Sequence, residues 1–568
     1  MILAENVTSL PEVVLTTADV FPASGDASQT FFDTKGWKHP VSYFVGRNGS
    51  GKSRTAKLIA ARTEGRLLST DRLAGLMLYT NYGWTSVPAT EGFRGIPLGD
   101  HERNQARNLA QSGSGIDEMY ALKEQPEVWL RVAAFLRRAL GRVIELRESA
   151  GLLDPYVRIG DVEYSLLRDE GHGLRELVIL LTAVYREDWK LLVVDEPELH
   201  LHPSMTRLWL SELERACRVG DRRAIVVTHD PSVVKATSAA DLEAVWLFVP
   251  GRPSQPLADH VGGTEAARVT ASLQGNPNLV SQLVFSPRPV LVEGVHDVAA
   301  LTVAMARTQP AEVVAQTDLI ECGGSSEVAM WFGIARGAGL DVRAVADLDA
   351  CLAPQVQRVM DAKPEVIARY RTDFSVEPPK TSTVLRPLLD AMNAAAVPAD
   401  PKSRAAWLAT EVPPGTGWQS RCDKLLDVWR ESGLWLHHQG TLENVLGISV
   451  KGREAAATAA GRAGDIDAVA AWCAYVLDPL GDVETLLNAA VERIAHSIME
   501  ALRVSPSTEF CAPVGGSAVS DARLVRVEPL GGGNYRLTVL KPKEFQDYFL
   551  EFSRDTPSSA LVLRKADA

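Results

Sequence analysis

Residues 46–53 read Gly46-Arg47-Asn48-Gly49-Ser50-Gly51-Lys52-Ser53, which is a complete match to the pattern G-x-x-x-x-G-K-[ST]. A short β-prone run at 41–45 (VSYFV) precedes this stretch, and residues 53–62 (SRTAKLIAAR) have the pattern of a helix. In a strand–loop–helix unit of this kind, glycines let successive backbone N–H groups surround phosphate oxygens at the helix N-terminus. We therefore expect these eight residues to bind the phosphates of ATP, with Lys52 at the β- and γ-phosphates and the Ser53 hydroxyl on Mg²⁺.

Two further strand ends carry residues suited to phosphate chemistry. Residues 191–203 read LLVVDEPELHLHP, in which four apolar residues predict a buried strand that ends at two acids. Asp195 is placed to hold Mg²⁺, and Glu196 to orient or deprotonate the attacking water. Residues 224–230 (AIVVTHD) predict another buried strand, and His229 at its end is placed to contact the γ-phosphate.

These three elements, in this order, resemble the ABC-type ATPases. The resemblance implies a head-to-tail ATP sandwich, and hence a homodimer or higher homo-oligomer, in which a glycine loop of one subunit closes on the nucleotide of the other. Gly171 and Gly173, ahead of a helix expected at 174–185, occupy the position of that loop. The serine that usually precedes the first glycine is absent, with acids at 169 and 170 in its place, so this chain departs from the family pattern there.

The segment between the glycine-rich motif and this loop is short. Its length of about 120 residues and its lack of sustained heptads leave no room for a long coiled coil. A helix is expected over 128–148, and Gln105 and Gln111 are two alternatives for the glutamine of the family's Q-loop.

Acidic residues also follow the strands expected in the second half of the chain. Residues 289–297 (PVLVEGVHD) predict a strand that ends at Glu293, with Asp297 opening the next helix. A strand at 318–322 follows, and a third at 342–346 ends at Asp347 and Asp349. Open α/β sheets carry their sites at the carboxyl ends of strands, where these four carboxylates could bind one or two Mg²⁺ or Mn²⁺ ions. Such ions activate water and stabilise the in-line displacement of a phosphodiester.

The order and spacing of these acids resemble the TOPRIM domain, and an ABC-type ATPase followed by TOPRIM resembles the OLD family of anti-phage nucleases. The resemblance implies one more metal-binding carboxylate, Glu443 in residues 440–446 (GTLENVL), and a basic residue at the scissile phosphate, Lys451. A solvated surface lysine is an equal alternative for Lys451. His437 and His438 are favoured as packing residues rather than ligands.

The resemblance further implies that ATP turnover gates cutting or nicking of DNA, with defence against phage as the purpose and a phage-encoded trigger among the partners. Two alternatives stay open. The TOPRIM site could cut RNA such as tRNA, since both nucleic acids share the phosphodiester. The chain could also be a DNA-repair or recombination mediator.

Composition agrees with a soluble globular chain of 568 residues, 46% hydrophobic and 23% charged. No apolar run reaches membrane-spanning length, and no secretory signal is evident, so we expect a cytoplasmic protein without a membrane partner. The six cysteines contain no C-x-x-C pair, which argues against a disulfide framework and a zinc site. The net charge of −12 leaves a nucleic-acid partner open, because contact depends on a local basic surface.

The expected fold class is α/β, with several domains in a chain of this length. We expect an ABC-type P-loop ATPase domain at 1–260, a linker at 261–285 within a loop-like region, and a Rossmann-like TOPRIM domain at 286–450. A helical insertion is expected at about 352–433 of the TOPRIM domain. Residues 451–568 are expected to form a helical and hairpin region, a small C-terminal α/β lobe with its turn at the three glycines 531–533.

Overall fold

The computed structural model describes residues 11–22, 28–73 (without 36 and 38), 95–149, 151–410, 417–449, 452–474 (without 463) and, with gaps, parts of 483–499 and 525–566. The chain divides into two compact units, Met1–Tyr475 and Val476–Ala568. In the part of the chain that the structure describes, no helix is long and apolar enough to cross a membrane.

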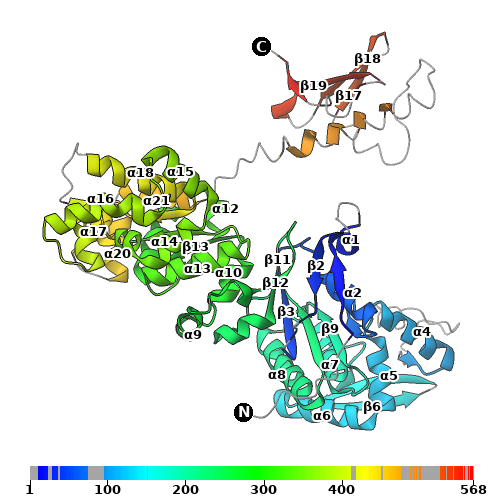
Figure 1. The fold of residues 1–568 in the computed structure, drawn as a ribbon. Helices are drawn as coiled ribbons and strands as arrows, with labels where there is room; N and C mark the ends of the chain where they lie inside the picture. The colour runs from blue at the N-terminus through cyan, green and yellow to red at the C-terminus, as the bar shows by residue number, and fades with distance from the viewer. Residues whose placement is uncertain are drawn as a thin grey trace. The chain divides into compact units, whose positions relative to one another are not determined.

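A six-stranded sheet organises the first half of the larger unit (Figure 1). Its strands are, in sheet order, β12 (Gln255–Pro256), β11 (Val245–Phe248), β3 (Val41–Gly46), β10 (Arg223–Val227), β9 (Leu191–Asp195) and β4 (Arg66–Leu68). All neighbours pair in parallel except β12 with β11. Strands β3 and β9 are buried throughout, as expected of parallel strands covered on both faces.

Side chains alternate between the two faces of this sheet. On one face, Phe44, Val193 and Ile225 pack with Ile59 of α2 (Lys52–Arg62). The antiparallel pair β1 (Val14–Thr16) and β2 (Thr30–Asp33) joins the same cluster. On the other face, the alternate strand residues pack against α7 (His172–Tyr185) and α8 (Pro203–Gly220). Because β3 lies between β11 and β10, the glycine-rich loop at its end leaves the sheet next to these two strands.

The segment between β4 and α7 forms a small lobe of helices and an antiparallel sheet. It contains α4 (Asp100–Gln111), α5 (Ile116–Glu124), α6 (Pro126–Leu140), β5 (Ile96–Pro97), β6 (Val143–Ser149), β7 (Leu152–Ile159) and β8 (Val162–Ser165). The prediction of a helix over 128–148 was wrong in its second part. α6 ends at Leu140, because the next residue, Gly141, has a left-handed backbone (φ 65°) that caps the helix. Residues 143–149 pair instead with β7 along their whole length.

Residues 261–285 differ from the loop-like linker that the sequence suggested. They form α9 (Ala266–Gly275) and α10 (Leu279–Phe285). Val269 and Leu273 lie one turn apart on α9 and are fully buried, as are Leu279 and Leu283 on α10. This i, i+4 spacing was present in the sequence, and its burial makes the segment part of the core rather than a loose connection.

A second sheet of four parallel strands follows in the order β14-β13-β15-β16. These strands are β13 (Arg288–Val292), β14 (Thr317–Glu321), β15 (Arg343–Ala346) and β16 (Leu434–Leu436). The alternation of strands and helices agrees with the α/β expectation. Between β15 and β16 lie α14 (Pro354–Asp361), α15 (Pro364–Phe374), α16 (Thr381–Ala394), α17 (Pro401–Thr410) and α18 (Gly417–Glu431).

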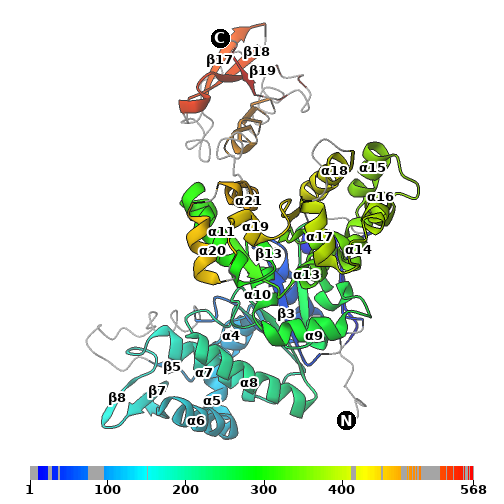
Figure 2. The ribbon, with the colours of Figure 1, turned by 90° about the vertical axis from the view of Figure 1, so that its left-hand side faces the viewer.

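Helices cover both faces of this sheet. α13 (Ser325–Gly337) packs on one face, and α11 (Val295–Thr308) on the other with α20 (Arg453–Ala460) and α21 (Asp465–Cys473) beside it (Figure 2). Ala456 of α20 and Ile466 and Val469 of α21 are buried in the apolar cluster on this face of the sheet. Residues 453–473 thus pack with the strands before them, whereas the sequence had grouped them with the C-terminal region.

The smaller unit is built on an antiparallel sheet in the order β17-β18-β19-β20. β17 (Val525–Gly531) and β18 (Asn534–Val539) form the hairpin expected at the glycine cluster, with Gly531 and Gly532 at positive φ in the turn. β19 (Tyr548–Ser553) and β20 (Arg564–Lys565) complete the sheet. Its core combines strand residues with apolar side chains from 487–499.

Candidate nucleotide and metal sites

The glycine-rich loop starts at Gly46, the last residue of β3, which is paired with Phe248 at the end of β11. A Cβ atom on Gly46 (φ 141°) would lie 2.2 Å from the carbonyl oxygen of Phe248, so only glycine fits there. Lys52 begins α2 and is 4% exposed, and its Nζ donates to the carbonyl oxygens of Gly46 (2.7 Å) and Arg47 (2.9 Å). Burial lowers the pKa of Lys52 to about 8, against the opposing charges of Asp195 and Glu196. The phosphates of a nucleotide bound in this loop would supply negative charge close to the buried Lys52 ammonium group and would stabilise its charged form.

The structure brings the hydroxyl and the carboxylate expected to hold Mg²⁺ into direct contact. Ser53 Oγ, in the first turn of α2, donates to Asp195 Oδ1, at the end of β9, over 3.0 Å. Burial raises the pKa of Asp195, because the charged form loses hydration. Hydroxyl and carboxylate oxygens are ligands of the type that Mg²⁺ prefers, so this pair fits the ion that accompanies ATP.

Glu196 and His229 lie side by side at the ends of β9 and β10, with 3.6 Å between Glu196 Oε1 and His229 Nε2. Burial lowers the pKa of His229, and the charge of Lys52 adds to that effect, so the imidazole is neutral at pH 7. Glu196 has a left-handed backbone (φ 50°), which costs a residue with a side chain about 1 kcal/mol. Such local strain at a strand end must be held by its surroundings.

Sequence reasoning missed Glu198, two residues beyond Glu196. Its Oε1 accepts hydrogen bonds from Thr228 Oγ1 (2.8 Å), from the backbone N–H of His229 (2.8 Å) and from that of Asp230 (3.2 Å). Glu198 therefore fixes the loop that carries His229. The only signal in the sequence was a third acid in the run 195–198, which could equally have been a solvated side chain.

The second glycine loop lies at the start of α7, where Gly171 is the N-cap. A Cβ atom on Gly173 would lie 2.8 Å from the carbonyl oxygen of His200, so Gly173 has a packing requirement within its own subunit. Gln105 and Gln111 both lie in α4, and the structure does not distinguish between them as the Q-loop glutamine.

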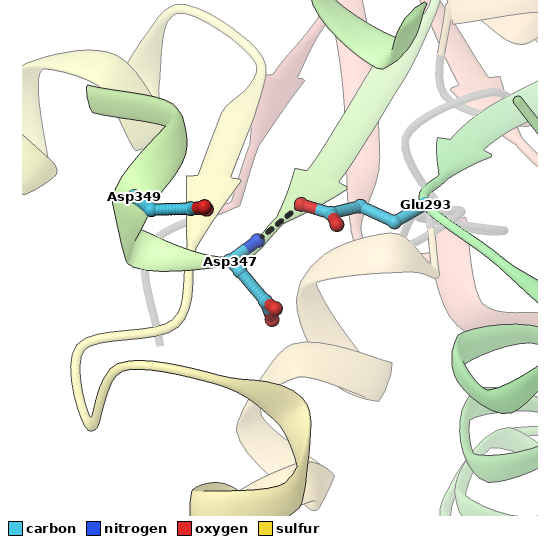
Figure 3. Close-up of side chains that lie close together, drawn as sticks. All are labelled: Glu293, Asp347 and Asp349. Carbon is cyan, nitrogen blue, oxygen red and sulfur yellow. Dashed lines mark hydrogen bonds between the residues drawn. The ribbon is translucent and has the colours of Figure 1, made fainter. Parts of the chain in front are cut away.

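Three of the expected metal ligands meet at the carboxyl ends of β13 and β15 (Figure 3). One carboxylate oxygen from each of Glu293, Asp347 and Asp349 lies within 4.8 Å of the others. Glu293 Oε1 accepts the backbone N–H of Asp347 (2.8 Å), and the Asp349 side chain points toward the same space. Asp349 Oδ1 is buried and has no hydrogen-bond partner among the described residues. An all-oxygen set with an unpartnered buried oxygen fits a hard divalent cation such as Mg²⁺ or Mn²⁺.

The electrostatics of this cluster also favour a cation. Burial raises the pKa of Glu293 to about 8, and the neighbouring charges of Asp347, Asp297 and Asp349 contribute. Burial likewise raises the pKa of Asp297 to about 7, with a contribution from Asp347. Asp297 lies in the first turn of α11, where its Oδ2 accepts the N–H of Gly294 (3.1 Å).

Of the two remaining candidates, Glu443 lies among the described residues and Lys451 does not. Glu443 lies in α19 (Leu442–Leu446), and its charge is among those that raise the pKa of Asp297. The N–H of Leu442 donates to Asp347 Oδ1 (3.0 Å), which ties α19 to the acids. Lys451 lies outside the described residues.

The two histidines after β16 have different surroundings. His437 is 1% exposed, and neither ring nitrogen has a hydrogen-bond partner among the residues described. Burial lowers the pKa of His437 to about 4, so its ring is neutral at pH 7. His438 Nε2 lies 2.6 Å from Asp423 Oδ1 at the surface.

The raised pKa of Glu293 predicts how pH affects the metal-free fold. Because the native state holds this proton more tightly than the unfolded chain does, stability falls as pH rises from about 4.5 to about 8. We expect Glu293→Gln to raise the Tm of metal-free protein by about 2 °C or more at pH 8.5 and to change it little at pH 5. Calorimetry checks this, with Asp341→Asn, exposed before β15, as the control. Equal effects at both pH values would contradict the assignment.

One family of known proteins is similar to part of the chain. The family described as "AAA domain, putative AbiEii toxin, Type IV TA system" matches residues 155–235, which include α7, β9, α8 and β10. No curated protein matches the chain.

Among solved structures, an Smc head bound to the C-winged helix domain of ScpA is 12% identical with a TM-score of 0.23, over 33% of this chain and 53% of that one. An Smc head with an extended coiled coil, bound to the C-terminal domain of ScpA from Pyrococcus furiosus, is 14% identical with a TM-score of 0.19, over 28% and 40%. The chain thus spans about half or less of these structures.

The family match falls on the strand ends that carry Asp195, Glu196 and His229. Together with the parallel sheet and the glycine-rich loop on β3, it shows a P-loop ATPase-type domain in this part of the chain.

Proposed function

We propose that this chain is an ATP-hydrolysing, metal-dependent endonuclease of the OLD-like, ATPase–TOPRIM kind, in which the ATPase controls when the acid cluster cuts DNA. One observation carries the nuclease assignment. Glu293, Asp347 and Asp349, from two neighbouring parallel strands, converge within 4.8 Å, and the raised pKa of Glu293 favours a bound cation. This position, at the carboxyl ends of strands in a parallel sheet, is where α/β sheets place catalytic groups.

In this proposal Glu293, Asp347 and Asp349 are the central metal ligands, and Asp297 and Glu443 supply further carboxylates. A divalent cation bound there would activate water and stabilise the oxygens of a phosphodiester displacement. The chain's own contribution is to fix the ligands: the Asp347 N–H holds Glu293, and the N–H of Leu442 holds Asp347. Lys451 remains a candidate for contact with the scissile phosphate.

ATP would bind through residues 46–53, with Ser53 and Asp195 on its Mg²⁺ and Lys52 on the β- and γ-phosphates. Glu196 would take a proton from the attacking water, and the neutral His229 beside it would contact the γ-phosphate. The loop at Gly171 and Gly173 would close on the nucleotide of a second copy, so ATP would drive homodimerisation or higher assembly. After hydrolysis, the two ATPase domains would separate again.

A role in defence against phage follows from the OLD resemblance, and the matched family's description, which mentions a toxin and a toxin–antitoxin system, supports it. The trigger would then be a phage product. The cluster itself does not distinguish DNA from RNA, because its ligands address the phosphodiester and not a base.

Cleavage assays test the proposal. Purified full-length protein is incubated with supercoiled plasmid and, separately, with total tRNA, with Mg²⁺, Mn²⁺ or EDTA, and with or without ATP. We expect plasmid nicking that needs the metal, responds to ATP and disappears in the Asp347→Ala/Asp349→Ala variant. Cleavage of tRNA alone would assign a ribonuclease instead. No cleavage of either substrate, with ATP turnover intact, would overturn the nuclease assignment and favour a mediator.

A further inference from the structure

Arg72, four residues beyond β4, is completely buried (0% exposed). Its Nη1 donates to the carbonyl oxygens of Ser69 (2.7 Å) and Asp195 (2.7 Å), and its Nη2 to that of Glu196 (2.8 Å). The guanidinium also forms an ion pair with Glu176. Arginine is almost never fully buried unless it is paired, so each of these contacts contributes to holding the charge inside the fold.

Two of these contacts hold the backbone that presents Glu196. β9 ends at Asp195, and Arg72 donates hydrogen bonds to the carbonyl groups of Asp195 and of the next residue, Glu196. The left-handed backbone of Glu196 is fixed from the other side as well, because its N–H donates to the carbonyl of Val227 on β10 (2.8 Å). The direction in which the Glu196 carboxylate leaves the chain is therefore set between β10 and Arg72.

The ion pair connects Arg72 to a second part of the ATPase. Glu176 lies in the first half of α7, close behind the loop at Gly171 and Gly173, and is 1% exposed. Burial raises the pKa of Glu176 to about 7, and Arg72 opposes that effect. A shift of α7 would move Glu176 and, through the ion pair, the Arg72 guanidinium. That movement would change the hydrogen bonds that Arg72 donates to the carbonyls of Asp195 and Glu196.

We propose that Arg72 is a positioning residue for ATP hydrolysis, which sets the backbone of Glu196 and links it to α7. It acts through Glu196, since its Nη atoms contact only carbonyl groups and Glu176 among the described residues. The inference rests on the ATPase half of the proposed function and needs no assumption about the acid cluster.

The test separates positioning from general stability. We expect Arg72→Met to lower kcat for ATP on the order of 10- to 100-fold, as a small misplacement of a catalytic group can, with KM changed less than about threefold. The matched control is Arg66→Met, which removes another ion-paired arginine, 15% exposed, whose partners are Asp117 and Glu118 rather than the end of β9. This control should lower Tm and leave kcat within about twofold.

A double variant gives the sharper readout. Breaking a buried ion pair destabilises a fold, but replacing both partners with apolar residues is often neutral. Arg72→Met/Glu176→Met should therefore recover much of the Tm lost in Arg72→Met while kcat stays low, because no donor remains for the carbonyls of Asp195 and Glu196. Recovery of kcat together with Tm would overturn the proposal, since Arg72 would then only stabilise the fold.

Arg72→Lys keeps the charge and provides a variant in case the methionine variants do not fold. One ammonium group cannot reproduce the forked contacts to three carbonyls and a carboxylate, so we expect kcat to fall at least about fivefold with KM little changed. A lysine variant with kcat near that of the parent protein would overturn the proposal. Failure of the proposed ATPase activity is distinguishable, because the parent protein itself would then show no turnover above a Lys52→Ala variant.

Discussion

Asp347→Asn is expected to reduce phosphodiester cleavage on the order of 100-fold or more while ATP turnover stays within about twofold. The asparagine oxygen can still accept the N–H of Leu442, and the backbone N–H that holds Glu293 is unchanged, so the local fold should persist. What is lost is a negative charge at the centre of the cluster. Initial rates of plasmid nicking at fixed Mn²⁺ measure the effect, and Mn²⁺ titration calorimetry should show weaker binding.

Asp341→Asn provides the matched control for this variant. Asp341 precedes the same strand, β15, but lies at its opposite end, is 61% exposed and pairs only with Arg336 among the described residues. The same change in charge should leave cleavage and Mn²⁺ binding unaltered. If both variants cut at the parent rate, the cluster is not the nuclease site, even though its geometry fits a cation.

Much of the site was predictable because motif residues stand at strand ends. In a parallel sheet, strand ends gather at one edge, so Ser53, in the helix that follows β3, comes together with Asp195, at the end of β9. The same logic placed Glu293 beside Asp347. For Asp195, Glu293 and Asp347, a run of apolar residues followed by an acid was enough to predict both the strand and the position of its carboxylate.

Other contacts have no local signature. Arg72 and Glu198 act through backbone carbonyl and N–H groups of residues on other elements, and nothing near them in the sequence indicates such partners. The break between α6 and β6 depended on one left-handed glycine, Gly141. The packing of residues 453–473 on α11 is a long-range contact that small, alanine-rich helices do not reveal by their composition.

Glu196→Gln is expected to lower kcat for ATP on the order of 100-fold or more, because the amide cannot take a proton from the attacking water. Glutamine has the same shape, so the left-handed backbone and the position of His229 should persist, and ATP should bind as tightly as before. With hydrolysis blocked, the ATP-bound state should accumulate, so light scattering should show a larger fraction of dimer with ATP than in the parent protein.

Glu198→Gln distinguishes the base from its neighbour. The Glu198 carboxylate already accepts three hydrogen bonds, and a glutamine oxygen can keep these contacts, so turnover in this variant should remain within about threefold of the parent. The reverse result, with Glu198→Gln inactive and Glu196→Gln active, would identify Glu198 rather than Glu196 as the general base. The geometry argues against that outcome, since Glu198 is committed to the His229 loop, whereas Glu196 is strained into the conformation that sets its carboxylate beside His229.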